Sequence, residues 1–255
     1  MTEFSPRLLL HPPLRGSLNM AVDTWLVTHS NRPVLRFYEW KHPTLTVGYR
    51  QQYQPPDELK SLLGTYSSAL RPTGGGYLLH AGTLTYSIVF PEEHPGSERS
   101  IMEMYSIIRD QFQTVLETMG VDLPEDRGET SQTTPDCLKH PGRHEPVVEG
   151  RKWMAAAQVC TETGVLQHGS LYVDSPEEVE FPGERPFYLS RQGYPVDRSR
   201  VISEFIRRMD ENCFSNTFNY EPLREEEWEQ ISDMESHFMC ENIENLPSFR
   251  LSDFR

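Results

Sequence analysis

Apolar positions along this chain recur with two different periods, and the period distinguishes helices from strands. Between residues 101 and 119 the apolar side chains fall three or four positions apart, and Gly120 follows at once. This spacing predicts a long amphipathic helix, and a glycine directly after it is typical of a helix C-terminus. Shorter segments with a similar spacing predict further helices over residues 19–30, 55–63, 201–213 and 225–239.

Short runs rich in β-branched and aromatic residues predict strands between these helices. They cover residues 34–38, 44–49, 69–70, 77–79, 84–90, 153–160 and 165–173. Residues 122–150 show little periodicity and contain four prolines, so we expect a long loop there. Long loops in compact domains are often functional.

Three consecutive glycines, Gly74, Gly75 and Gly76, stand between two of the predicted strands. Backbone without Cβ atoms turns easily with positive φ and approaches other groups closely. One interpretation is a tight hairpin, because Gly-Gly between apolar runs is a common hairpin signal. The other is a binding loop, because ordering three glycines costs conformational entropy and therefore needs a reason.

The composition is that of a globular protein. A chain of 255 residues with 36% hydrophobic and 24% charged content can bury a sizeable core. No apolar run approaches the about 20 residues needed to cross a bilayer, and the apolar stretch Leu8–Leu10 is too short for a secretory signal. We expect a cytoplasmic protein with no membrane partner, and its four cysteines, which form no CxxC pair, as free thiols.

The net charge of −14 argues against a nucleic-acid partner, because phosphate binding needs clustered Lys and Arg. The acidic residues concentrate between positions 221 and 244. Such runs usually form a solvated helix face, and we expect one here.

A second segment, from Gly150 to Asp174, favours a binding role for the glycines. It contains Gly-Arg-Lys, then three alanines followed by glutamine, then Gln-His-Gly-Ser. Together with the glycine run, this segment resembles the catalytic domain of the lipoate–protein ligase and octanoyltransferase family, a relative of the biotin protein ligases. Residues 16–23, 38–51 and 84–89 match the same family in the same order, so the resemblance covers roughly residues 8 to 175.

The resemblance implies an α+β fold, with a mixed, mainly antiparallel sheet and helices packed on it. It implies one catalytic domain over residues 1–255, of which 176–255 form a mostly helical part. The implied enzyme is an acyltransferase that takes an octanoyl or lipoyl group from a carrier-protein thioester, holds it as a cysteine thioester and passes it to a lysine of a lipoyl domain. Its partners are an acyl carrier protein or a lipoyl-domain protein, and it needs no cofactor. Such partners are commonly acidic, so their docking would need a basic patch, for which the candidates are Arg191, Arg198, Arg200, Arg207 and Arg208.

Two alternatives stay open. One is an ATP-dependent lipoate–protein ligase, with an adenylate bound over the glycine run and Lys152. The other is a catalytically weakened relative that binds acyl groups or lipoyl domains. The family pattern has glycine where this chain has Ala155, and the added methyl group argues against an adenylate at that position. The chain after the last family strand also leaves little room for the further C-terminal domain of the ligases.

Cys137 is the expected nucleophile. It lies in the proline-rich loop between Asp136 and Lys139, which is not the pattern of a core residue. In the octanoyltransferases the nucleophilic cysteine lies in this loop, and a reactive thiol needs exposure and a nearby base. The alternative is a zinc site of Cys137, His140 and His144, but no fourth ligand is evident nearby, so we expect no metal.

Lys152 is the second expected catalytic residue, because the matching lysine of the family holds the acyl carbonyl. A fixed ammonium there would stabilise a developing oxyanion. We expect its side chain to be surface-like and to contribute little to folding stability.

The remaining candidates are expected to bind the substrate. His80 is either a buried structural histidine or a base that orients Cys137. Asp23 is expected to tie the N-terminal helix to the sheet, and Cys160 to face the core. The expected substrate-binding residues are Arg71, Gly74, Gly75, Gly76, His80, Ala155, Gln158 and His168.

Overall fold

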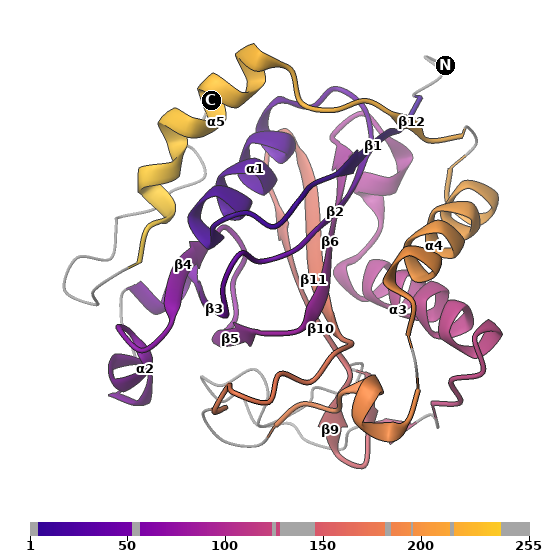
Figure 1. Cartoon of the computed structure of the whole chain (residues 1–255). Coiled ribbons are helices and arrows are strands. Elements are labelled where there is room, and N and C mark those ends of the chain that lie inside the picture. The colour runs from indigo at the N-terminus through magenta and orange to yellow at the C-terminus, as the bar shows by residue number, and fades with distance from the viewer. Residues whose placement is uncertain are drawn as a thin grey trace.

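The computed structural model describes residues 5–52, 57–123, 126–127, 146–181, 185–194, 196–214 and 217–240. At its centre is a six-stranded sheet in the order β10-β11-β6-β2-β1-β12 (Figure 1). Neighbouring strands from β10 to β2 are antiparallel, and β1 runs parallel to both β2 and β12. The expected α+β fold with a mixed, mainly antiparallel sheet is therefore confirmed. The bounds are β1 (Arg7–Leu10), β2 (Val34–Tyr38), β6 (Thr83–Pro91), β10 (Met154–Cys160), β11 (Gly164–Tyr172) and β12 (Asn219–Tyr220).

Helices cover both faces of this sheet. Helix α1 (Gly16–His29) lies on one face, and α3 (Ile101–Thr118) and α4 (Arg198–Asn212) lie on the other (Figure 1). Successive side chains of a strand point to opposite faces. In β2, Val34 and Tyr38 accordingly pack into the core on the α1 side, whereas Leu35 and Phe37 pack into the core under α3 and α4. The sheet thus separates two cores.

Helix α1 is buried along most of its length, from Gly16 to Val27. It contacts β6 and β11 of the sheet, and also β4, α5 (Glu225–Met234) and the 3-10 turn η4 (Glu235–Phe238). A helix that is covered on several sides needs no polar face. This explains why its apolar pattern is only approximately periodic.

The glycine run belongs to a smaller sheet of three strands, β3 (Thr44–Gly48), β4 (Ser67–Arg71) and β5 (Tyr77–His80). Their order is β4-β3-β5, with β3 parallel to β4 and antiparallel to β5. Residues 72–76, which we call the glycine loop, therefore join two strands that are not partners, and they pass the end of β3. The hairpin interpretation is wrong, because β3 lies between the two strands that a hairpin would pair.

The clearest helix of the sequence forms as expected. Helix α3 begins with a capping box, in which Ser100 and Glu103 satisfy each other's backbone N–H groups. It is followed by Gly120 with φ of +80°, a left-handed conformation that favours glycine. The other expected helices are α2 (Asp57–Leu62), α4 and α5, the last ending in the turn η4.

Two features differ from the sequence-based expectation. Two strands of a small third sheet, β7 (Asp126–Arg127) and β8 (Pro146–Val148), lie within the expected long loop, and its third strand, β9 (Arg151–Lys152), follows directly after it. The sequence pattern predicts no strand before residue 34, yet Arg7–Leu10 form β1. A strand of four residues is too short to show a period, so only its neighbours β2 and β12 identify it.

No helix in the described ranges is long and apolar enough to span a membrane. The division of the chain into domains stays a prediction.

The acidic segment near the end of the chain does more than face solvent. Glu227 is 5% exposed and receives hydrogen bonds from Arg7 Nη1 and Nη2 at 3.0 and 2.8 Å. The Arg224 backbone N–H also donates to it, at 2.7 Å. Burial by itself would raise the pKa of Glu227, but these donors lower it from 4.5 to about 2. This ion pair joins α5 to β1 and corrects the expectation of a wholly solvated face.

We expect Glu227→Gln to lower the free energy of unfolding by about 3 kcal/mol at pH 7, because it leaves the Arg7 guanidinium buried without its carboxylate. A carboxyl group whose pKa is lower in the folded than in the unfolded protein stabilises the folded state at pH values above the unfolded pKa. The difference from wild type should therefore shrink as the pH falls from about 4.5 toward 2. Urea unfolding at several pH values measures it, with the exposed Glu226→Gln as control. An equal loss in both variants would contradict a specific role for the pair.

Candidate active site

The main pocket lies between the α1-side face of the large sheet and the small sheet. Its volume is ≈ 570 Å³, within the usual range for ligand pockets. One wall is β10 and β11, and another is β3, β5 and the glycine loop. The pocket also reaches around the free edge of β10 to Ile101 and Tyr105 of α3. It therefore extends along the side of the sheet where β10 has no neighbouring strand among the described residues.

Most of the predicted substrate-binding residues meet at this pocket, although they lie on five segments of the chain. Gly76 belongs to the same loop but does not line it. Lys152 lies in β9 and also does not line it, and Cys137 is outside the described residues, as are His140 and His144. The predicted residues that line the pocket are Arg71, Gly74, Gly75, His80, Ala155, Gln158 and His168.

The glycine loop approaches the end of β3 too closely for a side chain at Gly48. A Cβ built on Gly48 would lie 2.3 Å from the Gly75 carbonyl oxygen, and Gly75 itself has φ of +93°. The Arg71 side chain holds this loop through hydrogen bonds to its backbone. Its Nη2 donates to the carbonyl oxygens of Gly74 and Gly76 at 3.0 and 2.9 Å. Arg71 thus shapes the pocket by fixing the loop, in addition to lining it.

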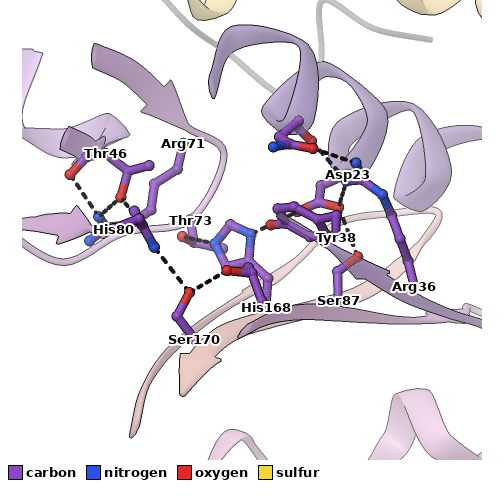
Figure 2. A network of polar contacts seen from close by, with 12 residues as sticks. Asp23, Arg36, Tyr38, Thr46, Arg71, Thr73, His80, Ser87, His168 and Ser170 are labelled. Carbon is purple, nitrogen blue, oxygen red and sulfur yellow. Dashed lines mark hydrogen bonds and ion pairs between the residues drawn. The ribbon is translucent and has the colours of Figure 1, made fainter. Parts of the chain in front are cut away.

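His80 lines the pocket with a neutral imidazole ring. Its Nε2 lies 2.8 Å from Thr46 Oγ1, and its Nδ1 lies 3.0 Å from Ser170 Oγ (Figure 2). The ring also stacks on Trp40, with centroids 4.1 Å apart. Burial, and then the nearby charge of Arg71, holds the pKa of His80 well below its usual value. Both ring nitrogens are already engaged by hydroxyls, so the expectation of a structural histidine describes it better than that of a base for Cys137.

The hydroxyl groups around His80 extend its hydrogen bonds into a chain of polar contacts across the pocket wall. Trp40 Nε1 donates to Thr85 Oγ1 at 2.8 Å, and Thr85 Oγ1 lies 2.8 Å from Ser170 Oγ. Every polar group in this chain has a partner within the protein. An apolar ligand can therefore lie against the wall without leaving a buried polar atom unsatisfied.

Asp23 organises a second set of contacts. Its carboxylate accepts hydrogen bonds from Arg36 Nη1 (2.7 Å), Tyr38 Oη (2.9 Å), Ser87 Oγ (2.8 Å) and His168 Nδ1 (3.0 Å), as Figure 2 shows. Burial by itself would raise the pKa of Asp23, but Arg36, His168 and Ser87 hold it below its ordinary value. The expectation that Asp23 ties the N-terminal helix to the sheet is confirmed.

Gln158 places an unsatisfied amide group at the pocket. Both polar atoms of its side-chain amide are buried and have no hydrogen-bond partner among the described residues. The residue lines the pocket at the edge strand β10. A buried amide without partners is costly, so we expect a bound molecule or an undescribed part of the chain to satisfy it.

Lys152 differs from the expectation of a surface-like residue. It is 2% exposed and pairs with Val147 across β8 and β9. Lysines are almost never fully buried unless they are paired. The expectation of a surface-like side chain is therefore wrong, and we expect removal of Lys152 to affect the packing.

The described cysteines also differ from one another. Cys160 is exposed and lines the pocket, so the expectation that it faces the core is wrong. It is the last residue of β10, which is an edge strand in the part of the chain that the structure describes. Burial raises the pKa of Cys213 and raises that of Cys240 to about 12, so neither thiol ionises readily at neutral pH.

Several residues in or beside the pocket were not predicted from the sequence. Thr46, Thr73 and Ser170 supply the hydroxyls that hold the two histidines, and Trp40 covers His80. Thr73 and Ser170 lie next to the Gly-Gly-Gly and His-Gly segments, so their proximity was a usable signal. Thr46 and Trp40 carried none, because threonine and tryptophan are ordinary strand residues.

Comparisons with known proteins agree with this geometry. Residues 15–181 match the model of the lipoyl protein ligase A/B catalytic domain. The chain belongs to this family. Among its relatives, octanoyltransferase LipM of Kyrpidia tusciae is 34% identical over 187 residues, which cover 67% of this chain and 68% of that protein. LipM of Oceanobacillus iheyensis is 28% identical over 94% of this chain and 97% of that protein.

A solved structure supports the fold of this lipoyl protein ligase A/B catalytic domain. Protein Ta0514 of T. acidophilum, determined with bound lipoic acid, superposes with a TM-score of 0.73. The identity is 21%, over 91% of this chain and 94% of that one. The resemblance inferred from the sequence motifs is confirmed.

Proposed function

We propose that this protein is an octanoyltransferase. It moves an octanoyl or lipoyl group from an acyl carrier protein to a lysine of a lipoyl domain, through a thioester on Cys137. The observation that carries this proposal is the pocket of ≈ 570 Å³ beside the glycine loop, whose wall hydroxyls and His80 are already satisfied. The relatives named octanoyltransferase LipM support it.

The pocket suits an aliphatic acyl chain. Met20, Trp40, Leu78 and Ala155 supply apolar surface, and the polar wall groups are paired among themselves. Burial of a methylene group contributes about 0.8 kcal/mol, so the seven carbons beyond the carbonyl of an octanoyl group contribute about 6 kcal/mol. This is enough to select an eight-carbon chain over a short one.

The chemistry follows from two residues. The Cys137 thiolate attacks the carbonyl carbon of the donor thioester, and the tetrahedral intermediate collapses with release of the carrier thiol. The amine of the acceptor lysine then attacks the Cys137 thioester, which forms an amide and returns the thiol. An ammonium group at Lys152 would stabilise the oxyanion in both steps. Exchange between thioesters is nearly balanced and transfer to an amine is downhill, so we propose that no ATP is consumed.

The nucleophile is tested with cysteine variants. We expect Cys137→Ser to abolish transfer, because the thiolate forms the intermediate. Cys160→Ser should keep most of it, and this is the matched control, since Cys160 is an exposed thiol at the same pocket. Mass spectrometry after incubation with octanoyl-carrier protein should find the acyl group on Cys137. Full activity of Cys137→Ser would overturn the covalent mechanism.

The absence of an ATP requirement is tested with the same protein. We expect octanoyl transfer from the carrier thioester without nucleotide, and no lipoate-stimulated exchange between ATP and pyrophosphate. The reason is Ala155, which is buried beside the pocket where the family has glycine. Formation of lipoyl-AMP would instead make the protein a ligase. Binding of octanoate without transfer by either route would make it a weakened relative.

Lys152 is tested with a variant that keeps its volume. Because the side chain is buried, Lys152→Met should fill the space that Lys152→Ala would leave empty. We expect Lys152→Met to lower acyl transfer by roughly 10²–10³-fold, the scale for loss of one oxyanion donor. Lys152→Arg should rescue poorly, because a planar fork replaces a compact ammonium. Activity and melting temperature that fall in proportion would show a structural role only.

A further inference from the structure

The glycine loop is connected to helix α1 by a chain of hydrogen bonds through β11. Asp23 of α1 binds His168 Nδ1 at 3.0 Å, and His168 Nε2 lies 2.8 Å from Thr73 Oγ1 (Figure 2). Thr73 immediately precedes the three glycines. Three residues that are far apart in the sequence thus form one continuous contact, which ends at the loop that lines the pocket.

The carboxylate of Asp23 determines the orientation of the histidine. An ionised carboxylate only accepts hydrogen bonds, so His168 Nδ1 must carry a proton and donate it. In the neutral ring Nε2 is then an acceptor, and the Thr73 hydroxyl donates to it. The other three donors to Asp23, from Arg36, Tyr38 and Ser87, keep the carboxylate in place. The histidine is therefore held in one tautomer and one orientation.

Thr73 links the oriented histidine to the glycine loop. It is 0% exposed, and its carbonyl oxygen accepts a hydrogen bond from the Tyr49 N–H at 3.2 Å. The glycines that follow have little conformational preference of their own. Their conformation therefore depends on the groups that contact the loop. Besides Thr73, these are the Arg71 guanidinium, the Gly48 N–H, which donates to the Gly76 carbonyl oxygen at 2.9 Å, and Gln51 Nε2, which donates to that of Gly75 at 3.3 Å.

We propose that Thr73 is a positioning residue for acyl transfer: its hydroxyl, held by His168 and Asp23, sets the loop conformation in which Gly74 and Gly75 contact the acyl donor. This inference rests on the proposed function. In the described part of the chain neither Thr73 nor Asp23 lines the pocket. Both therefore act through the loop and through His168, without touching the substrate.

The test compares Thr73→Val, which keeps the shape and removes the hydroxyl, with Thr73→Ser, which keeps the hydroxyl. We expect Thr73→Val to lower kcat/KM for octanoyl-carrier protein about 10- to 100-fold, the scale for misplacing a group that positions substrate. The KM for the lipoyl domain should not change. Thr73→Ser should recover most of the loss. Amide hydrogen exchange over residues 72–76 should be faster in Thr73→Val.

Thr24→Val is the matched control. Thr24 lies in α1 beside Asp23, and its buried hydroxyl has no hydrogen-bond partner among the described residues. We expect unchanged kinetics and loop exchange in this variant. Equal kcat/KM and equal exchange in Thr73→Val and Thr73→Ser would overturn the proposal, as would a loss in Thr73→Val that only follows its melting temperature. If the wild-type protein forms no acyl-Cys137, the proposed function fails, whereas the exchange comparison still tests the loop.

Discussion

The structure depends on one buried carboxylate. Asp23 accepts four hydrogen bonds, from Arg36 and Tyr38 of β2, Ser87 of β6 and His168 of β11. An unpaired charge at this depth would be very costly, so the helix and the three strands must meet in one arrangement to satisfy it. Because β11 also forms a wall of the pocket, the contact that fixes α1 on the sheet fixes the pocket as well.

The two histidines of the pocket show how a polar site can accept an apolar ligand. His80 and His168 each use both ring nitrogens for contacts within the protein. For His80, burial and the Arg71 charge keep the pKa low, so the ring remains neutral. The wall therefore presents paired groups to the pocket, and Gln158 is the exception, with both amide atoms unsatisfied among the described residues. We therefore expect a polar group, either of the ligand or of an undescribed part of the chain, to bind at Gln158.

The strand order of the small sheet explains the path of the glycine loop. Since β3 separates β4 from β5, the loop has to pass the end of β3 within contact distance of Gly48. A side chain on Gly48 would prevent that approach, and Arg71 binds the carbonyl oxygens of Gly74 and Gly76. Gly74 and Gly75 of the same loop line the pocket.

The sequence by itself determined most helices and strands, because their apolar periods match the faces that they bury, as in α3. It also determined the family, because five motifs occur in the expected order, and most of the candidate site residues, because those motifs carry them. Only the tertiary structure decided the rest. The order of β4, β3 and β5 excluded a hairpin that local sequence allowed, and β1 formed only because β2 and β12 offered it partners. Lys152 became buried and Cys160 exposed, although their neighbours in sequence suggested the opposite. Pairing and burial depend on residues far away along the chain, and no local pattern records those contacts.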